Sequence, residues 1–247
     1  VTPDSFSDGG DFTNVDIAVK HAKDMVEEGA DIIDLGGEST RPGHKFVSAE
    51  EELRRIVPVI KELKKEIKVP ISVDTYKSEV AEEALKLGVD MINDVWGLTY
   101  DEDMAEVIGK YDASVCIMHN QNGTEYDKDI MVSIKDFLQK SIDKALEAGV
   151  KKDKIVLDPG IGFGKTFEQN VEVLRRLNEL QDLGYPVLLG TSRKSVLGNI
   201  VAGEPKDRVE ATVATTVTGI RDGVDIVRVH DVKENLQAAM VADKLYR

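Results

Sequence analysis

The sequence predicts an α/β fold, specifically a (β/α)8 barrel of the TIM type. Short apolar runs alternate with amphipathic segments along the whole chain, the amphipathic segments number eight, and 247 residues is close to the length of such a barrel, about 250. Alternation alone would also allow an open doubly wound sheet, so length and helix count favour the barrel. No linker or shift in composition divides the chain, which predicts one domain over residues 1–247.

Seven apolar runs are predicted to be parallel strands buried on both faces, because they lack the polar alternation of a half-exposed strand. They are Asp31–Leu35, Ile71–Val73, Met91–Ile92, Val115–Met118, Ile155–Leu157, Val187–Leu189 and Ile226–Val229. A closed barrel needs one more strand ahead of the first helix, where only the residues around Val1 remain. We therefore expect the first strand of the barrel to be truncated in this sequence.

Eight helices are predicted from apolar residues that recur every three or four positions. One carries Leu53, Ile56, Val57, Ile60 and Leu63 behind a capping box of Ser48 and Glu51. Two further stripes run from Ile134 to Ala145 and through Leu174, Leu177 and Leu180, the latter with Thr166 and Gln169 as a capping box. The others are expected near Val15–Glu28, Ser78–Leu87, Glu102–Lys110, Arg208–Asp222 and Val232–Leu245.

Composition excludes several classes of partner. The formal net charge is −14, and a surface this acidic repels nucleic acid and anionic membranes, so neither is an expected partner. No apolar run approaches the ~20 residues of a membrane-spanning helix. The single cysteine, Cys116, lies within an apolar run, which predicts a core residue and fits a reducing, cytoplasmic location.

Polar and ionisable residues follow each predicted strand, and the carboxyl ends of the strands form the functional face of such a barrel. Each residue also has a simpler explanation. Asp74 could cap a helix and Asn93 could bond a turn, His230 could be structural, Met118 could pack, and Arg41 and Lys165 could each be solvated. The gathering of so many such residues on one rim favours a binding site over independent caps.

The charges on this rim indicate the substrate. Arg41, Lys194, Arg228 and His230 are basic residues in an acidic chain, which predicts an anionic substrate, and Arg is well shaped to bind phosphate. The acceptors among them are Asp74, Asn93 and Asp158, which suit a heterocycle rich in N–H donors.

Two motifs fail on inspection. Gly160, Gly162 and Gly164 followed by Lys165 resemble a phosphate-binding loop, but the Walker pattern requires Gly at Pro159, and the dinucleotide pattern requires Gly at Lys165. Cysteines or histidines paired at metal-binding spacing are absent from the sequence, so a structural zinc site is not expected.

Eight short motifs occur in order along nearly the whole chain. They are TPDSFSDGG from Thr2, GGESTRPG from Gly36, SVDT from Ser72, IND from Ile92, MHN from Met118, DPGIGFGK from Asp158, TSRKS from Thr191 and RVHD from Arg228. Any one is a weak signal, but together they resemble the dihydropteroate synthase family. The resemblance implies a (β/α)8 barrel and a transferase of folate biosynthesis that joins 6-hydroxymethyl-7,8-dihydropterin diphosphate to p-aminobenzoate and releases diphosphate.

The resemblance also implies roles for individual residues. The pterin is expected to contact Asp74, Asn93, Asp158, Lys194, Arg228, Met118 and Phe163. The diphosphate is expected to contact Thr40, Arg41, Arg228 and His230. The p-aminobenzoate side is expected to include Ser195, Phe163, Phe6 and Pro42. The residues expected to act in catalysis are Lys194, Arg228, His230 and Asp74.

Mg²⁺ is the cofactor that the resemblance implies. The family pattern places an Asn ligand directly before Val1, outside this sequence, and leaves Asp4 as a further candidate. The family is usually homodimeric, and the segments Arg208–Asp222 and Val232–Leu245 are candidates for the contact.

Two other functions stay open on sequence alone. One is a pterin-binding methyltetrahydrofolate–corrinoid methyltransferase domain, which would share the pterin-binding acids but would not need the TSRKS loop. The other is a catalytically silent pterin-binding protein.

Overall fold

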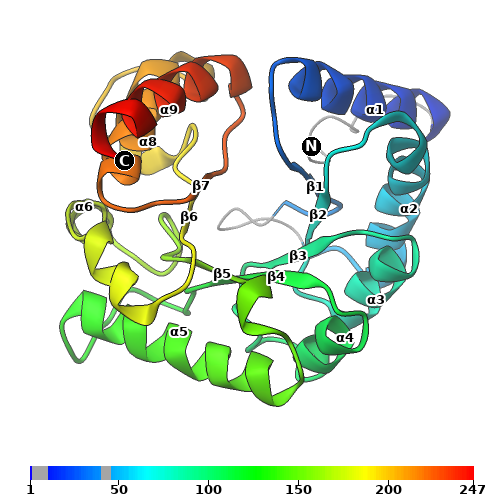
Figure 1. Ribbon diagram of the computed structural model, residues 1–247, viewed down its shortest axis with the longest axis horizontal. Coiled ribbons are helices and arrows are strands. Elements are labelled where there is room, and N and C mark those ends of the chain that lie inside the picture. The colour runs from blue at the N-terminus through cyan, green and yellow to red at the C-terminus, as the bar shows by residue number, and fades with distance from the viewer. Residues whose placement is uncertain (2–10, 40–45) are drawn as a thin grey trace. The chain divides into compact units, whose positions relative to one another are not determined.

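The structure is a computed structural model that describes Val1, residues 11–39 and residues 46–247, with only the backbone described for residues 11–14. Parallel strands and helices alternate along this part of the chain, as predicted (Figure 1). The chain divides into two compact units: unit 1 is Val1–Cys116 with Asp143–Lys154, and unit 2 is Ile117–Ile142 with Ile155–Arg247. The expectation of one domain over the whole chain therefore stays a prediction.

In the described residues, unit 1 contains helices α1 to α4, the end of α5 (Ile130–Glu147) and the first strands of a parallel sheet. In chain order its elements are α1 (Asp11–Glu27), β1 (Ile33–Gly36), α2 (Ala49–Glu66), β2 (Ile71–Asp74), α3 (Ser78–Lys86), β3 (Met91–Asp94), α4 (Met104–Lys110) and the start of β4 (Ser114–Met118). The five-stranded sheet has the order β1-β2-β3-β4-β5, so each strand lies beside its neighbour in sequence. Figure 1 shows α1 to α4 following one another along one side of β1, β2 and β3.

Burial explains why the strands of unit 1 lack alternation. All four residues of β2 and of β3 are buried, because side chains on both faces of these strands are covered. In α2, Ile56, Ile60 and Leu63 are fully buried, as the apolar stripe predicted, whereas Leu53 and Val57 are half-buried. Burying one such side chain contributes roughly 1.5–3 kcal/mol to folding.

Unit 2 contains the rest of the chain. Its elements are the end of β4, most of α5 (Ile130–Glu147), β5 (Ile155–Asp158), α6 (Phe167–Arg175), the 3₁₀ helix η3 (Leu177–Leu183), β6 (Leu188–Leu189), α7 (Ser195–Gly198), the 3₁₀ helix η4 (Pro205–Asp207), α8 (Val209–Arg221), β7 (Ile226–Val227) and α9 (Val232–Tyr246). A short 3₁₀ helix, η2 (Lys152–Lys154), precedes β5 in sequence and belongs to unit 1 with the end of α5. A single parallel bridge joins Leu157 to Val187, and β6 pairs with β7 in a separate two-stranded sheet.

All seven predicted strands are present, each within a few residues of its expected bounds. One expectation about the helices was wrong, and one helix was missed. The stripe through Leu174, Leu177 and Leu180 does not lie on one α-helix, because α6 ends at Arg175 and η3 follows. The short helix α7 was not predicted at all.

The two predicted capping boxes have different outcomes. Thr166 and Gln169 form both reciprocal hydrogen bonds at the start of α6. At α2, Ser48 Oγ accepts from Glu51 N at 3.2 Å, but the Glu51 carboxylate pairs with Arg54 and Arg55, and its return bond to the cap is not formed.

The first residue is tied to the edge of the sheet. The Val1 amino group donates to Asp34 O at 2.9 Å, and Val1 O accepts from Gly36 N at 3.0 Å, so Val1 bonds the backbone of β1 on the side away from β2. Across the described residues, the helices are too short or too polar to cross a membrane.

Candidate active site

Two predicted pterin residues of unit 1 are neighbours across the sheet. Asp74 ends β2 and Asn93 lies on β3, and the strand register pairs them directly. Both side chains are buried, with 4% and 5% of each residue exposed. Paired residues of adjacent parallel strands point to the same face, so a carboxylate and an amide are presented side by side. On the other side, the register partner of Asp74 is Gly36 of β1, where a β-carbon would lie 3.6 Å from Asp74 Cβ.

A buried ion cluster joins the segments that follow β1 and β2 to helix α2. Lys77 Nζ donates to Glu38, and to Glu52 at 2.6 Å, while the Tyr76 hydroxyl donates to both carboxylate oxygens of Glu38 at 3.0 and 3.1 Å. Val47 N also donates to Glu38. Burial raises the pKa of Glu52 in spite of its bond to Lys77. Lys77 is therefore committed to two carboxylates within unit 1 and serves the local structure.

In unit 2, Asp158 ends β5 and is 6% exposed. Its Oδ1 accepts from the backbone N–H of Gly160 at 2.7 Å, which fixes the carboxylate over the turn that follows the strand. Burial raises the pKa of Asp158, and the positive charges of Lys194, Lys165 and Arg228 oppose that rise. These charges favour the ionised form, which accepts hydrogen bonds and does not donate them.

Lys194 approaches the same place from the loop after β6. Its Nζ donates to Ile161 O and lies 4.7 Å from the centre of the Phe163 ring. A β-carbon at Gly162 would lie 3.3 Å from Lys194 Cδ, and Gly162 has a φ of +85°, so a side chain there would crowd the lysine and strain the backbone. The side chain of Lys194 therefore packs against the Gly-rich loop after β5.

Gly190 shows that three of the predicted residues converge. A β-carbon built at Gly190 would lie 3.9 Å from Asp158 Oδ2, 4.0 Å from Lys194 Nζ and 4.0 Å from Arg228 Cβ. Three elements of unit 2 thus bring a carboxylate, an ammonium group and an arginine to one point: β5, the loop after β6, and the end of β7. The missing side chain of Gly190 leaves room between them.

The loop that carries Lys194 includes an unusual backbone conformation. Arg193 has a φ of +59°, in the left-handed region that a non-glycine residue rarely adopts. Its guanidinium pairs with Asp231 through Nε at 3.0 Å and through Nη2 at 2.5 Å. Arg208 Nη1 donates to the carbonyls of Arg193 and Lys194 at 3.0 and 3.3 Å. This bonding holds the turn immediately before Lys194.

Three further predicted residues lie in unit 2. His230 Nδ1 is 2.8 Å from Ser192 Oγ, and His230 N donates to the same oxygen, which links the end of β7 to the TSRKS loop. Met118 ends β4 and is buried. Ser195 is exposed at the first position of α7.

Comparisons with known proteins show the family of the chain. The family model described as pterin binding enzyme matches residues 1–230. A dihydropteroate synthase of Clostridium beijerinckii is 55% identical to this chain, across 100% of the chain and 91% of the relative. A dihydropteroate synthase of Bacillus subtilis is 49% identical, across 99% of the chain and 86% of the relative.

The chain belongs to the dihydropteroate synthase family.

Solved structures of the family match the fold closely. A dihydropteroate synthase from Clostridium difficile, crystallised in the presence of pteroic acid, has a TM-score of 0.98 and 74% identity, covering 100% of this chain and 94% of that one. A Xanthomonas albilineans dihydropteroate synthase with 4-aminobenzoic acid has a TM-score of 0.93 and 41% identity, covering 99% and 90%. A Yersinia pestis enzyme with a sulfonamide drug has a TM-score of 0.92 and 42% identity, covering 99% and 91%.

These matches confirm the predicted fold class, the (β/α)8 barrel of dihydropteroate synthases, and an enzyme of the transferase class. In the described residues themselves, the strands form one five-stranded and one two-stranded sheet. Some site residues expected from the family resemblance lie outside the described part of the chain: Asp4, Phe6, Thr40, Arg41 and Pro42. Within the described part, no group of three or more His, Cys, Asp or Glu side chains could hold a metal ion.

Sequence reasoning missed several residues that organise this site. Lys165, which could have been solvated, is 9% exposed and bonded within its own loop. Arg193 and Asp231 were not singled out, although a basic residue beside Lys194 and an acid in the RVHD motif were visible signals.

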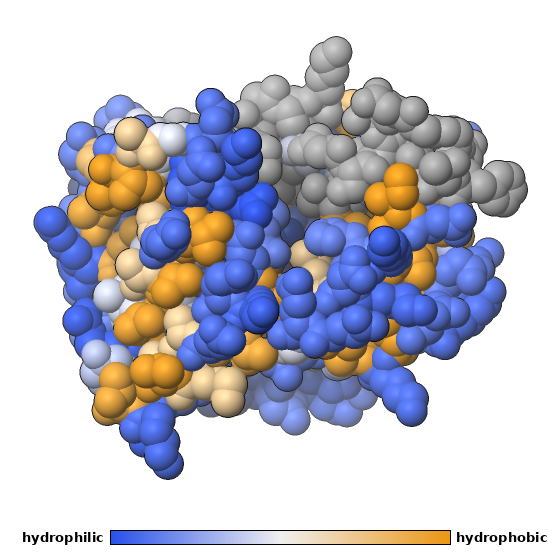
Figure 2. Space-filling view, turned by 90° about the horizontal axis from the view of Figure 1, so that it is seen from above, coloured by the Kyte–Doolittle hydropathy of each residue, from blue (hydrophilic) through white to orange (hydrophobic). Residues whose placement is uncertain are grey.

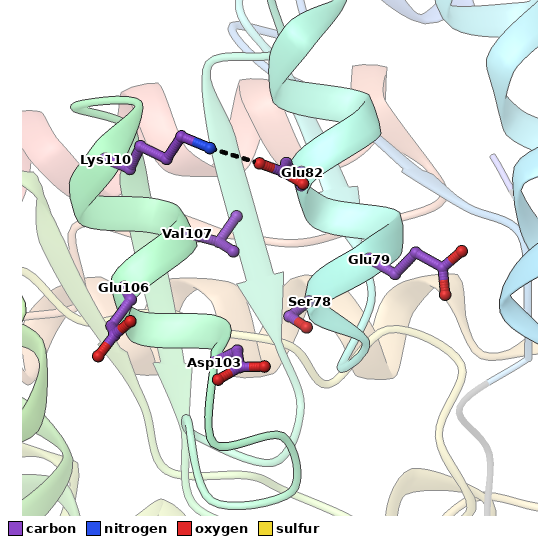
Figure 3. Close-up of a pocket in the computed structure, with 7 residues that line it drawn as sticks. All are labelled: Ser78, Glu79, Glu82, Asp103, Glu106, Val107 and Lys110. Atoms are coloured by element: carbon purple, nitrogen blue, oxygen red, sulfur yellow. Dashed lines mark hydrogen bonds and ion pairs between the residues drawn. The ribbon is translucent and has the colours of Figure 1, made fainter.

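A groove between α3 and α4 of unit 1 is a separate feature (Figure 3). It is lined by Ser78, Glu79, Glu82, Asp103, Glu106, Val107 and Lys110. Lys110 crosses it to pair with Glu82 at 2.7 Å. Its lining includes none of the predicted site residues and is mostly acidic, so it does not suit a diphosphate.

Proposed function

We propose that this member of the dihydropteroate synthase family joins 6-hydroxymethyl-7,8-dihydropterin diphosphate to p-aminobenzoate, and that Asp158 and Lys194 bind the pterin. The observation that carries the assignment is the convergence of Asp158, Lys194 and Arg228 around Gly190. A pterin presents an amino group and a ring N–H side by side, which is a donor pair that one carboxylate can accept. We propose Asp74 and Asn93 as further acceptors for the pterin, as the family resemblance implies.

Lys194 and Arg228 complement Asp158. An ammonium group can donate to ring nitrogen or carbonyl acceptors, and a planar guanidinium can lie against a flat ring. Phe163, whose ring lies under Lys194 Nζ, would contribute an apolar surface beside the pterin and toward p-aminobenzoate. Met118 would pack against the pterin, and the remaining residues proposed for the p-aminobenzoate side are Ser195, Phe6 and Pro42.

The reaction requires that the departing diphosphate is stabilised and that the pterin methylene carbon, the electrophile, is fixed in position. The bond from the pterin methylene carbon to the diphosphate oxygen breaks, and the electron pair leaves with the diphosphate. Positive groups and hydrogen-bond donors aimed at that charge lower the barrier. The positive groups proposed here are Arg228 and Arg41, and the uncharged groups are Thr40, through its hydroxyl, and His230, whose pKa burial lowers to about 4. The amine of p-aminobenzoate then forms the new C–N bond and loses a proton, and holding it beside the methylene carbon supplies much of the rate.

Mg²⁺ is the proposed cofactor, and when bound it would neutralise charge on the diphosphate. In sites that handle phosphates, Mg²⁺ is usually held by one or two carboxylates together with substrate oxygens. A dense acidic cluster is therefore not required, and its absence from the described residues does not conflict with the proposal. Asp4 remains the candidate ligand within this sequence.

Asp158→Asn tests the pterin assignment. Asn keeps the shape but replaces one acceptor oxygen with a donor that faces another donor, so pterin affinity should fall about 30- to 1000-fold. Calorimetric titration with a pterin ligand measures this, alongside the melting temperature. Asp101→Asn is the matched control, because Asp101 also accepts backbone N–H groups, from Ser78 and Asp103, and has no proposed ligand. Normal pterin affinity with lowered stability in Asp158→Asn would reduce Asp158 to a turn cap.

One assay addresses the two alternative functions. Release of diphosphate that requires both the pterin diphosphate and p-aminobenzoate is expected for a dihydropteroate synthase. A corrinoid methyltransferase domain or a silent pterin-binding protein would release none.

We also propose a homodimer in the cytoplasm. Met240, Val241, Leu245 and Tyr246 of α9 leave half or more of their surface exposed. Figure 2 shows apolar side chains gathered on the left of the view, over the region of α9. An exposed apolar face of this kind is typical of a contact with a second copy. Cys116 is the single cysteine of the sequence and is buried, which is consistent with a reducing compartment.

A further inference from the structure

Lys165 ends the Gly-rich loop after β5, and its side chain turns back into that loop. Its Nζ donates to Gly160 O and to Phe163 O, each at 3.0 Å, and lies 2.9 Å from His119 Nδ1. Only 9% of the residue is exposed. A lysine ammonium has three protons and no acceptor, so three surrounding acceptors satisfy it completely. The sequence from Gly160 to Lys165 resembles a phosphate-binding loop, but the lysine already has its hydrogen-bond acceptors within the protein and does not require a phosphate.

The third acceptor is a neutral histidine. Burial, followed by the charge of Lys165, lowers the pKa of His119 to about 3, so its ring is uncharged near neutral pH. Because an ammonium only donates, Nδ1 accepts and the ring carries its proton on Nε2. Tyr126 and Phe137 pack against the ring, with centroids at 6.1 and 5.0 Å.

The loop that Lys165 ties together is the one that holds Lys194. Gly160 and Phe163 flank Ile161, whose carbonyl accepts from Lys194, and the Phe163 ring lies under Lys194 Nζ. Gly160 also donates to Asp158. A loosened loop would displace the carbonyl, the ring and the N–H that orient Lys194 and Asp158.

Lys165 also adds charge to the cluster. The ionisable groups that face it are His119 at the end of β4, Asp158 on β5 and Lys194 in the loop after β6. Burial lowers the pKa of Lys165 to about 7, the Asp158 carboxylate raises it, and Lys194 lowers it. By the same coupling, the ammonium of Lys165 favours ionised Asp158.

We propose that Lys165 is a positioning residue for pterin binding, which holds the loop at Gly160 and Phe163 and thereby orients Asp158 and Lys194 without touching the substrate. This inference rests on the proposed pterin role of Asp158. The two lysines would then have different roles. Lys194 binds the pterin, and Lys165 holds the loop on which Lys194 lies.

Lys165→Met is the primary test, measured by calorimetric titration of the full chain with a pterin ligand between pH 5 and 8. Met keeps the length but removes the three donors and the charge, so affinity at pH 6, where Lys165 is mostly an ammonium, should fall about tenfold or more. The acidic limb of the affinity profile should also move to higher pH, because Asp158 loses a stabilising cation. A residue with a merely structural role would not move that limb.

Two further variants sharpen the result. Lys144→Met is the matched control, because Lys144 is also partly buried and donates to a backbone carbonyl, that of Leu98 in unit 1; its affinity profile should match that of the wild type. Lys165→Gln keeps two N–H donors without the charge. It should recover part of the affinity lost in Lys165→Met while keeping the shifted limb, and it carries the test if Lys165→Met does not fold.

The results for the Lys165 and Asp158 variants distinguish the proposed role of Lys165 from the proposed pterin-binding role of Asp158. If Asp158→Asn loses pterin affinity but Lys165→Met and Lys165→Gln keep the wild-type affinity and limb, the role of Lys165 is overturned and the proposed function stands. If Asp158→Asn binds the pterin normally, the proposed pterin role of Asp158 has failed first.

Discussion

Asp94 is a buried carboxylate one residue beyond Asn93, at the end of β3. Its two oxygens accept from the backbone N–H groups of Trp96 and Leu98, each at 2.8 Å, and 1% of the residue is exposed. Burial raises the pKa of Asp94 to about 6, against the lowering effect of the two N–H groups. The loop after β3 is therefore shaped by a carboxylate whose charge is costly inside the fold.

This pKa predicts how stability depends on pH. The folded pKa is about 6 and the reference value is 3.8, so between about pH 4 and pH 6 the folded chain binds more protons than the unfolded chain. The contribution of Asp94 to the free energy of unfolding is therefore present below pH 4 and is lost as the pH rises to 6. A difference of about two pH units corresponds to roughly 3 kcal/mol.

Asp94→Asn should remove this dependence. The stability of the variant relative to the wild type should rise by up to about 3 kcal/mol between pH 4 and pH 6 and stay level above that. Urea unfolding of both proteins at half-unit steps measures the difference. A difference that stays constant across this range would show that the pKa of Asp94 is ordinary.

Sequence reasoning works best for residues defined by where a strand ends. Asp74, Asn93 and Asp158 follow buried apolar runs, and the structure buries all three at strand ends. The role of Lys165 could not be predicted in this way. A Gly-rich run that ends in Lys reads the same whether the ammonium faces solvent or the loop carbonyls, and only the backbone path decides between them.

Among the elements, η3 shows what a periodic pattern leaves undetermined. Leu174, Leu177 and Leu180 are spaced by three residues, which is the repeat of a 3₁₀ helix as well as a permitted spacing on an α-helix. The chain leaves α-helical geometry at Arg176, whose φ is −122°. The Arg176 guanidinium then pairs with Asp129, Glu172 and Glu179. Glu172 and Glu179 are close to Arg176 in sequence, but Asp129 is 47 residues away, and the apolar stripe carries no signal for that distant partner.

The turn before α7 yields a prediction about backbone strain. Arg193 has a φ of +59°, which costs a residue with a side chain roughly 1–2 kcal/mol relative to glycine. Arg193→Ala and Arg193→Gly both lose the pair with Asp231, but only Gly is relieved of the strain. Arg193→Gly should therefore be more stable than Arg193→Ala by about 1 kcal/mol in denaturant unfolding.

The same pair of substitutions at Lys140 is the control. Lys140 is exposed within α5, where Ala should be more stable than Gly by about 1 kcal/mol. The sign of the Ala–Gly difference should thus reverse between the two positions. Equal or Ala-favouring stabilities at position 193 would show that the left-handed turn is not kept in the variants.

At the scale of the whole molecule, the acidic composition and the basic cluster have different consequences. The net charge of −14 is spread over the chain, whereas unit 2 gathers Lys165, Lys194 and Arg228 around the buried Asp158. Excess negative charge weakens non-specific binding of polyanions, so a small anionic substrate must be held by fixed local cations. The fold class was predicted from the alternation of strands and helices along the entire chain. An error in a single helix therefore did not change that prediction.

The proposed homodimer gives the last prediction. Val241 and Leu245 are one helical turn apart on α9, and 60% and 68% of their surfaces are exposed. Val241→Glu together with Leu245→Glu would place two charges in an apolar contact, where burial without a partner is strongly unfavourable. Sedimentation equilibrium should give about twice the chain mass for the wild type and the single-chain mass for the variant, with the helical circular dichroism unchanged. Val132→Glu, at a 42% exposed position of α5, is the control and should remain dimeric. A variant that stays dimeric would move the contact away from α9, and a monomeric wild type would reject the dimer itself.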